Sequence, residues 1–252
     1  MNINEEMQTE YKLGFIISIV TVTMAIITFA FAMVAIPISG AFCPNGCIEY
    51  PYLDVLKQYP KDFIWMYFAT LLSLSYLIFV ICIYHLSKSK IRIYSHIGMI
   101  FGIISSVILA CNYFIQATVI PASLASGDTY GIPLLIQYNH HGLFIAMEEI
   151  GFIFMTLSFA FLWQTFDGKN RIEATIRWFF KANVIIVFLS FIILLFIYGL
   201  DKKDRFEVIV ISVNWLVLIV NGILIGKVYM KKMKVNKITN IDKTDVKRMP
   251  PY

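Results

Sequence analysis

The chain has 252 residues, of which 59% are apolar and only 15% are charged, and its net charge is +5. A soluble domain carries about 25% charged residues, and a soluble protein this apolar would expose hydrophobic surface that favours aggregation. The composition therefore excludes a water-soluble enzyme, a disordered scaffold and a nucleic-acid-binding module. It indicates an integral membrane protein that contacts membrane lipids.

Six apolar stretches have the length that a membrane-spanning helix requires, which is about 20 mostly apolar residues. They are continuous rather than alternating and much longer than barrel strands, so strands are excluded. We predict an all-α polytopic membrane helical bundle with six transmembrane helices in residues 13–229, between an N-terminal segment 1–12 and a tail 230–252. The predicted spans are residues 13–38, 63–84, 97–120, 142–166, 182–200 and 208–226.

The first apolar stretch is 26 residues long, well beyond the roughly 7–15-residue apolar core of a secretory signal. A lipoprotein signal ending before Cys43 is also disfavoured, because the bulky Phe42 stands where processing requires a small residue. We therefore expect the first helix to remain in the protein as a membrane span.

The loop after the first span contains Cys43 and Cys47, which bracket a Pro-Asn-Gly turn. On the outer face of the membrane these cysteines would meet an oxidising compartment, where a disulfide would close a tight loop. The alternative is a metal or redox pair, but no histidine is nearby in sequence and the spacing is not CxxC. The pattern favours a structural disulfide over redox chemistry.

The third span carries a polar face. Gly98 and Gly102 form a GxxxG pair, which allows another helix to approach closely. The amides Asn112 and Gln116 lie one turn apart near the outer end of the same face, within an arc of about 120°. Helix packing explains the two glycines better than it explains the two amides, which are therefore candidate ligand-binding residues.

The fourth span is interrupted by Glu148 and Glu149, and His141 precedes Glu148 by seven residues, which places both on nearly the same helix face. An ionisable group inside a membrane is costly and predicts a functional site. The alternative is a structural anchor, such as an ion pair with Arg205 or Lys203 at the outer end of the sixth span. The residues alone leave both interpretations open.

The sixth span adds Asn214 and Asn221, also seven residues apart on one face, and a second GxxxG pair at Gly222 and Gly226. Counted from the outer helix ends, polar groups from three spans reach the same depth in the outer third of the membrane. We predict that they share a pocket that opens outward. The candidate ligand-binding residues are Asn112, Gln116, His141, Glu148, Glu149 and Asn214.

The lysines and arginines predict the orientation of the bundle. With the N-terminus inside, the inner segments hold 16 of these residues and the outer segments hold 5. Because positive residues concentrate on the cytoplasmic side, we expect both termini to be cytoplasmic. The basic tail 230–252 lacks apolar periodicity, so we expect it to be disordered and attracted to anionic lipids by about 1 kcal/mol per basic residue.

Motifs for cofactor or metal chemistry are missing from the sequence. It contains no P-loop, no dinucleotide-binding fingerprint and no HExxH motif. Its four histidines are too few for the multi-helix histidine clusters of intramembrane metal enzymes, and the adjacent His140 and His141 would point apart on a helix. We therefore expect no metal and no cofactor, and catalytic residues stay unknown.

Three segments of the chain resemble a family of uncharacterised small multi-pass prokaryotic membrane proteins, known only as a domain of unknown function. They are CPNGCIEYPY at 43–52, IQYNHHGLFIAMEEIGFIFMTLSFAF at 136–161 and RFEVIVISVNWLVLIVNGILI at 205–225. The resemblance covers most of residues 13–230 and implies a six-helix or similar bundle in a prokaryotic cytoplasmic membrane. It implies no activity and no site residues.

Our leading hypothesis is that the bundle binds or transports a small or amphipathic ligand in the outward-facing polar pocket. Glu148 or Glu149 would supply charge or a proton, and the amides would orient the ligand. One alternative is an enzyme that modifies lipids with the carboxyl pair as acid and base. Another is a non-catalytic assembly subunit, whose GxxxG faces would bind a partner helix or a second copy of the chain.

Overall fold

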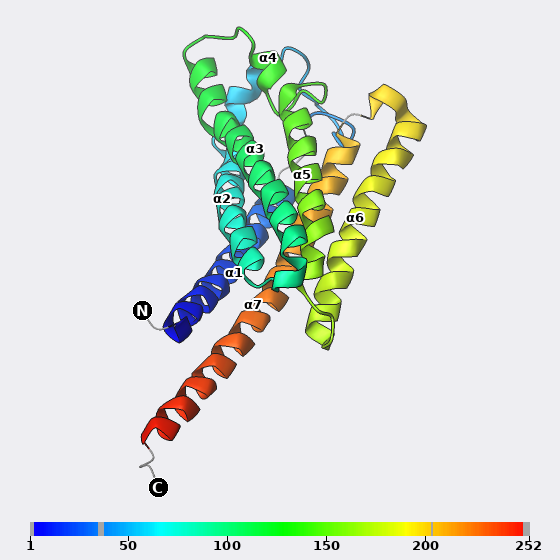
Figure 1. The fold of residues 1–252 in the computed structure, drawn as a ribbon. Helices are drawn as coiled ribbons and strands as arrows, with labels where there is room; N and C mark the ends of the chain where they lie inside the picture. Colours follow the sequence, from blue (N-terminus) through cyan, green and yellow to red (C-terminus); the bar gives the residue numbers. More distant parts are fainter. Residues whose placement is uncertain (1–2, 35–37, 203, 249–252) are drawn as a thin grey trace.

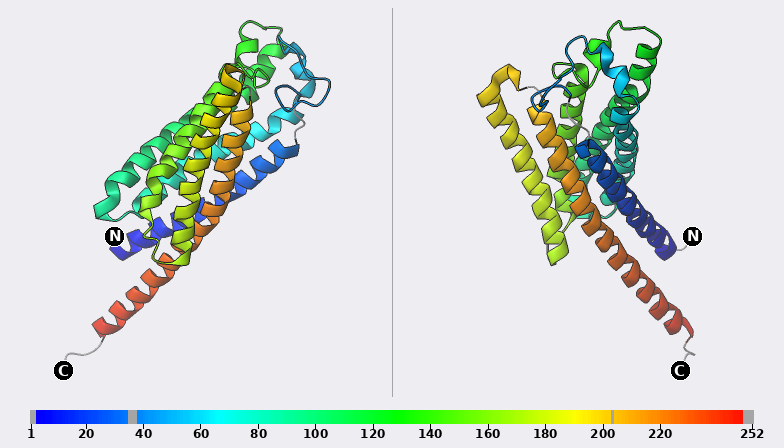
Figure 2. Two further views of the ribbon diagram at one scale, coloured as in Figure 1. Left: turned by 90° about the vertical axis from the view of Figure 1, so that its right-hand side faces the viewer. Right: turned by 180° about the vertical axis from the view of Figure 1, so that it is seen from behind.

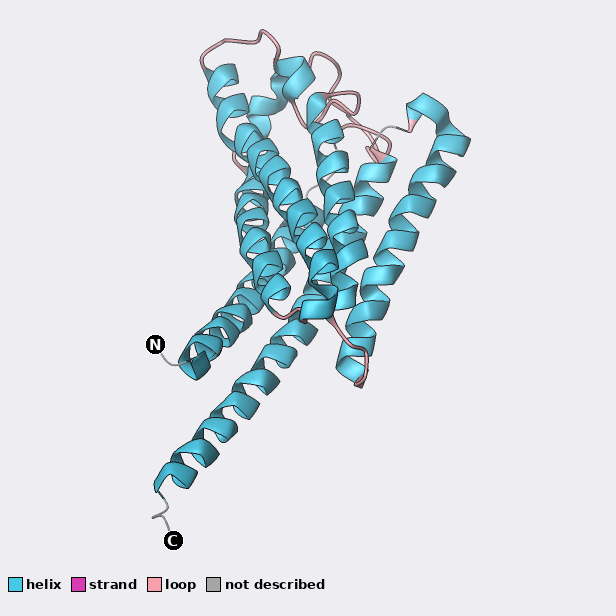
Figure 3. Cartoon of the chain, in the orientation of Figure 1, coloured by secondary structure: helices cyan, strands magenta, loops and turns pink. Residues whose placement is uncertain are grey.

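The computed structural model describes residues 3–34, 38–202 and 204–248. These residues are mostly helical and contain no strand (Figures 1 and 3). Among them, six helices are long and apolar enough to cross a membrane, which confirms the predicted all-α bundle of six transmembrane helices. The six are α1 (Ile3–Val34), α2 (Ile64–His85), α3 (Arg92–Ala125), α5 (Leu143–Leu162), α6 (Arg171–Tyr198) and α7 (Arg205–Arg248).

The described ends of the chain, at the start of α1 and the end of α7, lie at one end of the bundle, which we call the terminal end (Figure 1). The loops that follow α1 and α3 lie at the opposite end, which we call the distal end. Short helical segments connect successive spans along the chain. These segments are α4 (Ile132–Leu135) and the 3-10 turns Leu53–Gln58, Lys61–Phe63, Ser89–Ile91, Trp163–Thr165 and Gly199–Asp201.

The bundle is built around α1, α2, α3, α5 and α7. Helix α1 packs against α2 and α7, and α3 packs against α2 and α5. Helix α6 contacts α5 and α7 and lies at the edge of the bundle (Figure 2). Only 17% of its most apolar stretch is buried, so most of its surface is available to lipid.

Helices α1, α3, α6 and α7 extend beyond the apolar stretches that predicted them at one or both ends, whereas α5 lies within its predicted stretch. Helix α1 begins ahead of the predicted start at residue 13 and ends at Val34, and residues 35–37 of the predicted span lie outside the described residues. Helix α6 begins at Arg171, 11 residues before the predicted start at 182. Hydropathy marks where a helix crosses lipid, whereas the helix itself continues through polar residues that are good helix formers.

Helix α3 continues through Pro121. A proline lacks the N–H that would bind the carbonyl four residues earlier, here that of Ala117. The hydroxyl of Tyr67 on α2 donates a hydrogen bond to this carbonyl at 3.0 Å. A neighbouring helix thus supplies the donor that the proline lacks, which lets α3 reach Ala125 without an unsatisfied group.

The prediction of a disordered tail over residues 230–252 is not what the structure shows, because α7 continues as a helix to Arg248. No glycine or proline interrupts the chain between Lys227 and Arg248, so nothing in that stretch ends the helix. The amide of Asn236 also donates to Gln8 Oε1 on α1 at 3.1 Å. Residues 249–252 lie outside the described residues.

The two cysteines of the first loop, Cys43 and Cys47, form a disulfide with a Cα–Cα distance of 6.0 Å, in agreement with the pattern in the sequence. The loop is also held by a hydrogen bond from the Ile48 backbone N–H to the Ile38 carbonyl at 2.8 Å. The cysteines of the spans are unpaired thiols, buried at Cys82 and exposed at Cys111.

The predicted close approach at the third span occurs between α3 and α5. The Ser158 hydroxyl on α5 donates to the Gly98 carbonyl at 2.7 Å. A Cβ atom placed on Gly98 would lie 2.8 Å from Leu162 Cγ and 3.0 Å from the Ser158 carbonyl oxygen. These distances are too short for a methyl group, so the contact requires glycine.

Replacing Gly98 with alanine should force α3 and α5 apart and lower the melting temperature of the purified protein, since overpacking costs about 1–3 kcal/mol. The matched control is Gly226→Ala in α7, where the nearest atom to an added Cβ is at 3.5 Å. We expect this control to leave the melting temperature unchanged or higher, because alanine is the better helix former. Equal melting temperatures for the two variants would contradict the close contact.

Candidate functional site

The centre of the candidate site is a pair of carboxyl groups, Glu148 on α5 and Glu207 on α7. The Glu148 side chain is fully buried and Glu207 is 9% exposed. The two carboxyl groups interact electrostatically with each other. Two neighbouring carboxylates that are both charged repel each other strongly when they lie away from water. A shared proton or a bound cation between them removes this repulsion.

A tyrosine fixes one side of the carboxyl pair. The hydroxyl of Tyr113 on α3 donates to Glu148 Oε1 at 2.5 Å. The other oxygen, Glu148 Oε2, accepts no hydrogen bond within the described part of the chain. Tyr113 therefore orients Glu148 so that one of its oxygens is left for Glu207 or for a ligand atom bound between the two acids.

A cavity of about 490 Å³ lies at the distal end between α1, α2, α7 and the loops, and Glu207 forms part of its wall. The polar lining residues are Ser39, Asp62, Gln137, Tyr138, Asp204, Glu207 and Ser212. The apolar lining residues are Phe29, Ala32, Met33, Ile38, Phe42, Trp65, Val208, Ile211 and Trp215. The cavity thus combines carboxyl groups with a large aromatic and aliphatic wall.

The aromatic part of the wall comes from three helices. The ring of Trp215 lies 5.9 Å from that of Phe29 and 6.5 Å from that of Trp65, both in edge-to-face arrangements. Trp65 in turn contacts Tyr113, with ring centroids 5.5 Å apart. Aromatic faces attract cations as well as apolar groups, so this wall suits a ligand that carries both.

Two further carboxyl groups at the cavity hold the distal loops. Asp62 Oδ2 accepts a hydrogen bond from the Tyr138 hydroxyl at 3.2 Å, and Asp204 Oδ1 accepts one from the Ala41 backbone N–H at 2.9 Å. Burial, together with the Asp62 carboxylate, raises the pKa of Tyr138 above its ordinary value, so its hydroxyl stays protonated and remains a donor. Glu207 differs from both because it interacts with another acid, Glu148.

The predicted amides of the third span form hydrogen bonds with backbone groups. Asn112 Nδ2 donates to the Phe144 carbonyl at 3.0 Å. Gln116 Nε2 donates to the Leu135 carbonyl, and Gln116 Oε1 accepts from the Gln137 N–H at 3.1 Å. Gln116 thus satisfies backbone groups at the end of α4, where helical partners are missing, and Asn112 joins α3 to the first turn of α5.

Glu149 lies on a different side of α5 from Glu148. Its carboxylate forms an ion pair with the Lys202 ammonium, and both side chains are largely buried. The sequence pointed to Arg205 or Lys203 as the partner of an anchoring carboxylate. The structure instead places Arg205 over the ring of Tyr198 at 4.3 Å, and Lys203 lies outside the described residues.

The remaining two candidates are also separate from the cavity. Asn214 Nδ2 donates to the Val210 carbonyl at 2.8 Å and to Thr156 Oγ1 at 3.2 Å. His141 is exposed, and its ring lies against that of His140. The structure thus does not bring the six predicted residues into one pocket. Two of the six adjoin the cavity through a lining residue, Gln116 through Gln137 and Glu148 through Glu207.

Glu207 is a residue of the candidate site that the sequence did not predict. It stands one position before the predicted span 208–226 and just after several charged residues, so it was counted with a polar loop. A signal was nevertheless present: Glu207, Asn214 and Asn221 recur every seven residues, which places all three on one helix face. Extending that face by one step toward the distal end would have included the acid.

Within the described residues, no three His, Cys, Asp or Glu side chains converge in a way that could hold a metal ion. Comparison with known proteins also supplies no function for the site. No protein-family model matches the chain, and neither the curated proteins nor the solved structures contain a match. The chemistry of the carboxyl pair and its cavity is therefore the basis for a functional proposal.

The ion pair between Glu149 and Lys202 predicts a specific pattern of stability. Replacing Lys202 with methionine leaves a largely buried carboxylate without its partner, which should destabilise the protein by about 1–3 kcal/mol. The double variant Lys202→Met/Glu149→Gln removes both charges and should recover most of this loss. Melting temperatures in one detergent test the pattern, and an unchanged single variant would show that the pair stabilises nothing.

Proposed function

We propose that the protein binds small amphipathic cations, such as organic ammonium ions, in the distal cavity. Glu207 supplies the negative charge that the cation contacts, and Glu148 is the second acid behind it. The observation that supports this most directly is that the cavity wall contains one carboxyl of a buried pair. A cation beside Glu207 balances charge that would otherwise require a shared proton.

The charge of the cavity favours a cation over an anion. Three carboxyl side chains line it, those of Asp62, Asp204 and Glu207, and its described lining residues include no lysine or arginine. Asp62 and Asp204 are already engaged by a hydroxyl and a backbone N–H. Glu207 is therefore the carboxyl group that is best placed to accept a ligand cation.

The apolar wall indicates that the ligand is amphipathic. Trp65, Trp215 and Phe29 offer ring surfaces, and the volume of about 490 Å³ lies in the range of pockets that hold small organic molecules. At the edge of the cavity, Met33 and Val208 are exposed on the surface of the bundle. An amphipathic molecule that partitions into the membrane can approach the cavity from this side.

The geometry supports binding better than acid–base catalysis. Tyr113 does provide a third polar group within hydrogen-bond distance of a carboxyl, as an enzyme would require. However, Tyr113 and Glu148 are absent from the described wall of the cavity, and only Glu207 reaches it. A substrate in the cavity would therefore meet one member of the pair, which suffices for charge recognition but not for paired acid and base.

The assembly-subunit hypothesis is less well supported for a different reason. A bundle that serves only to bind a partner needs a filled core, with its small residues exposed to that partner. Here Gly98 and Gly102 pack against side chains within the bundle, and so does Gly222, where an added Cβ would lie 2.4 Å from Val22. These glycines contribute to internal packing, and the cavity remains to be explained by a ligand.

The proposal is tested with phenyltrimethylammonium and its neutral isostere tert-butylbenzene, titrated into the protein in lipid nanodiscs and followed by calorimetry. We expect the cation to bind at least about tenfold more tightly than the isostere, which corresponds to about 1.4 kcal/mol. We expect Glu207→Gln to weaken the binding of the cation by a similar factor. The matched control is Asp54→Asn, which removes a carboxylate at the distal end outside the cavity.

Equal affinity for the two isosteres would overturn the proposal, because the charge would then play no part in binding. So would a folded Glu207→Gln variant that binds the cation as tightly as the wild type. If Asp54→Asn weakens binding as much as Glu207→Gln, the effect arises from the general negative charge of the distal end and not from the carboxyl pair.

A further inference from the structure

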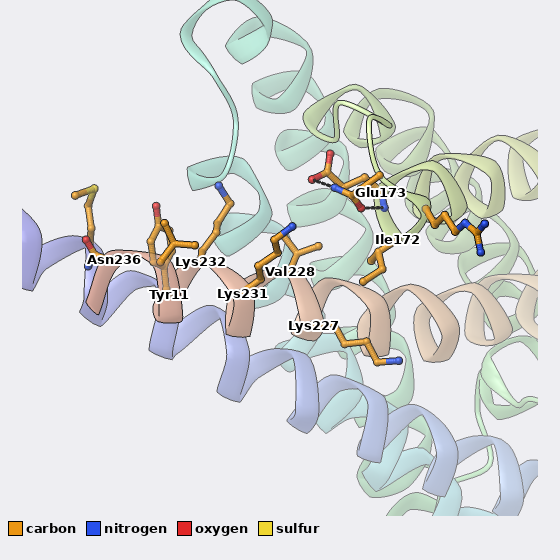
Figure 4. A pocket seen from close by; sticks show the side chains of 12 residues that line it. Tyr11, Ile172, Glu173, Lys227, Val228, Lys231, Lys232 and Asn236 are labelled. Carbon is orange, nitrogen blue, oxygen red and sulfur yellow. Dashed lines mark hydrogen bonds between the residues drawn. The ribbon is translucent and has the colours of Figure 1, made fainter. Parts of the chain in front are cut away.

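We propose that the terminal end of the bundle contains a second site, which binds the phosphate headgroup of an anionic phospholipid. A cavity of about 770 Å³ lies there between α1, the start of α6 and α7 (Figure 4). Four basic side chains line it: Arg171, Lys227, Lys231 and Lys232. Basic cavities between helices at the membrane surface are suited to anionic headgroups.

The basic side chains of this cavity form no salt bridge in the described part of the chain, although Lys232 interacts at longer range with the Asp167 carboxylate. Within the described residues, none of the four basic side chains forms an ion pair with an acid. The one acidic lining residue is Glu173, and its carboxylate accepts hydrogen bonds from Asn170 Nδ2 at 2.9 Å and from the Asp167 N–H at 2.8 Å. Glu173 thus caps the start of α6 and leaves the cations available to a ligand.

Aromatic residues at this end place the cavity at the level of lipid headgroups. Trp178 on α6 is 63% exposed, and the ring of Trp163 lies under the Arg177 guanidinium at 4.7 Å and the Lys181 ammonium at 4.1 Å. Exposed tryptophan together with basic residues is typical of the membrane interface. Arg171 begins the same helix, about two turns beyond Trp178, and so lies on the headgroup side of that interface.

An apolar groove next to the cavity indicates a whole lipid and not a free phosphate ion. This groove of about 230 Å³ runs between α1 and α7 and includes Phe15, Ile19 and Ile223. Lys227 lines both the groove and the basic cavity. A phospholipid can therefore place its phosphate among the lysines while an acyl chain follows the groove toward the middle of the bundle.

The lipid site is independent of the cation site at the distal end, because the two cavities share no lining residue. It is tested by adding phosphatidylglycerol, phosphatidylcholine or inorganic phosphate to the protein in detergent and recording the melting temperature. We expect phosphatidylglycerol to raise the melting temperature at lower concentration than phosphatidylcholine, and inorganic phosphate to have little effect. A ligand that binds only the folded state stabilises it in proportion to its affinity.

The key variant is Lys227→Gln/Lys231→Gln/Lys232→Gln. In this variant we expect half of the maximal rise in melting temperature to require at least about a tenfold higher phosphatidylglycerol concentration than in the wild type. The matched control, Lys90→Gln/Arg92→Gln/Lys169→Gln, removes three exposed charges near the same end but outside the cavity, and should leave the effect unchanged. If the triple variant does not fold, Lys231→Gln should weaken the effect and Lys231→Arg should retain it.

Three results would overturn the proposal. Equal stabilisation by phosphatidylglycerol and phosphatidylcholine would show that the headgroup charge is not recognised. An equal effect of inorganic phosphate would identify a site for free anions. An equal loss in the control triple variant would mean that the lipid responds to the overall charge of this end of the bundle.

Discussion

The contact between Glu148 and Glu207 is the constraint on which the organisation of this protein depends. Helices α5 and α7 each bring an acid to the interior of the bundle, and the two acids interact electrostatically. A structural role alone would be served at lower cost by apolar side chains, because buried ionisable groups in membranes are expensive. The pair therefore connects the surrounding features of the site. Tyr113 orients one acid, and the other acid lines the distal cavity beside its aromatic wall.

The two ends of the bundle have opposite chemistry, which follows from the distribution of charged side chains. The distal cavity is lined by carboxyl groups and aromatic rings, and the terminal cavity by lysines and an arginine. Each cavity places its charges beside an apolar wall, so each is suited to an amphipathic molecule, although of opposite charge. A bundle of this kind can hold one ligand from the distal side and one lipid at the terminal side at the same time, because the two cavities share no lining residue.

The architecture of the bundle followed from the sequence because each span is a long apolar run, and a membrane leaves such a run few alternatives to a helix. The burial of Glu148 was also foreseeable, since an acid in a span must avoid lipid. The partners of Asn112 and Gln116 were not, because they are backbone carbonyls of α5 and α4, which the identity of the side chains does not reveal. Glu207 was missed because a hydropathy boundary separated it from the helix face to which it belongs.

Helix α7 connects the two sites in one rigid piece. It carries Glu207 at its distal end, passes the lysines of the lipid site and continues to Arg248. At 1.5 Å per residue, this is a lever of about 60 Å, so a tilt of a few degrees at the acid displaces the far end by several ångströms. Any change in the tilt of α7 is therefore shared by the regions around both cavities, without any change of secondary structure.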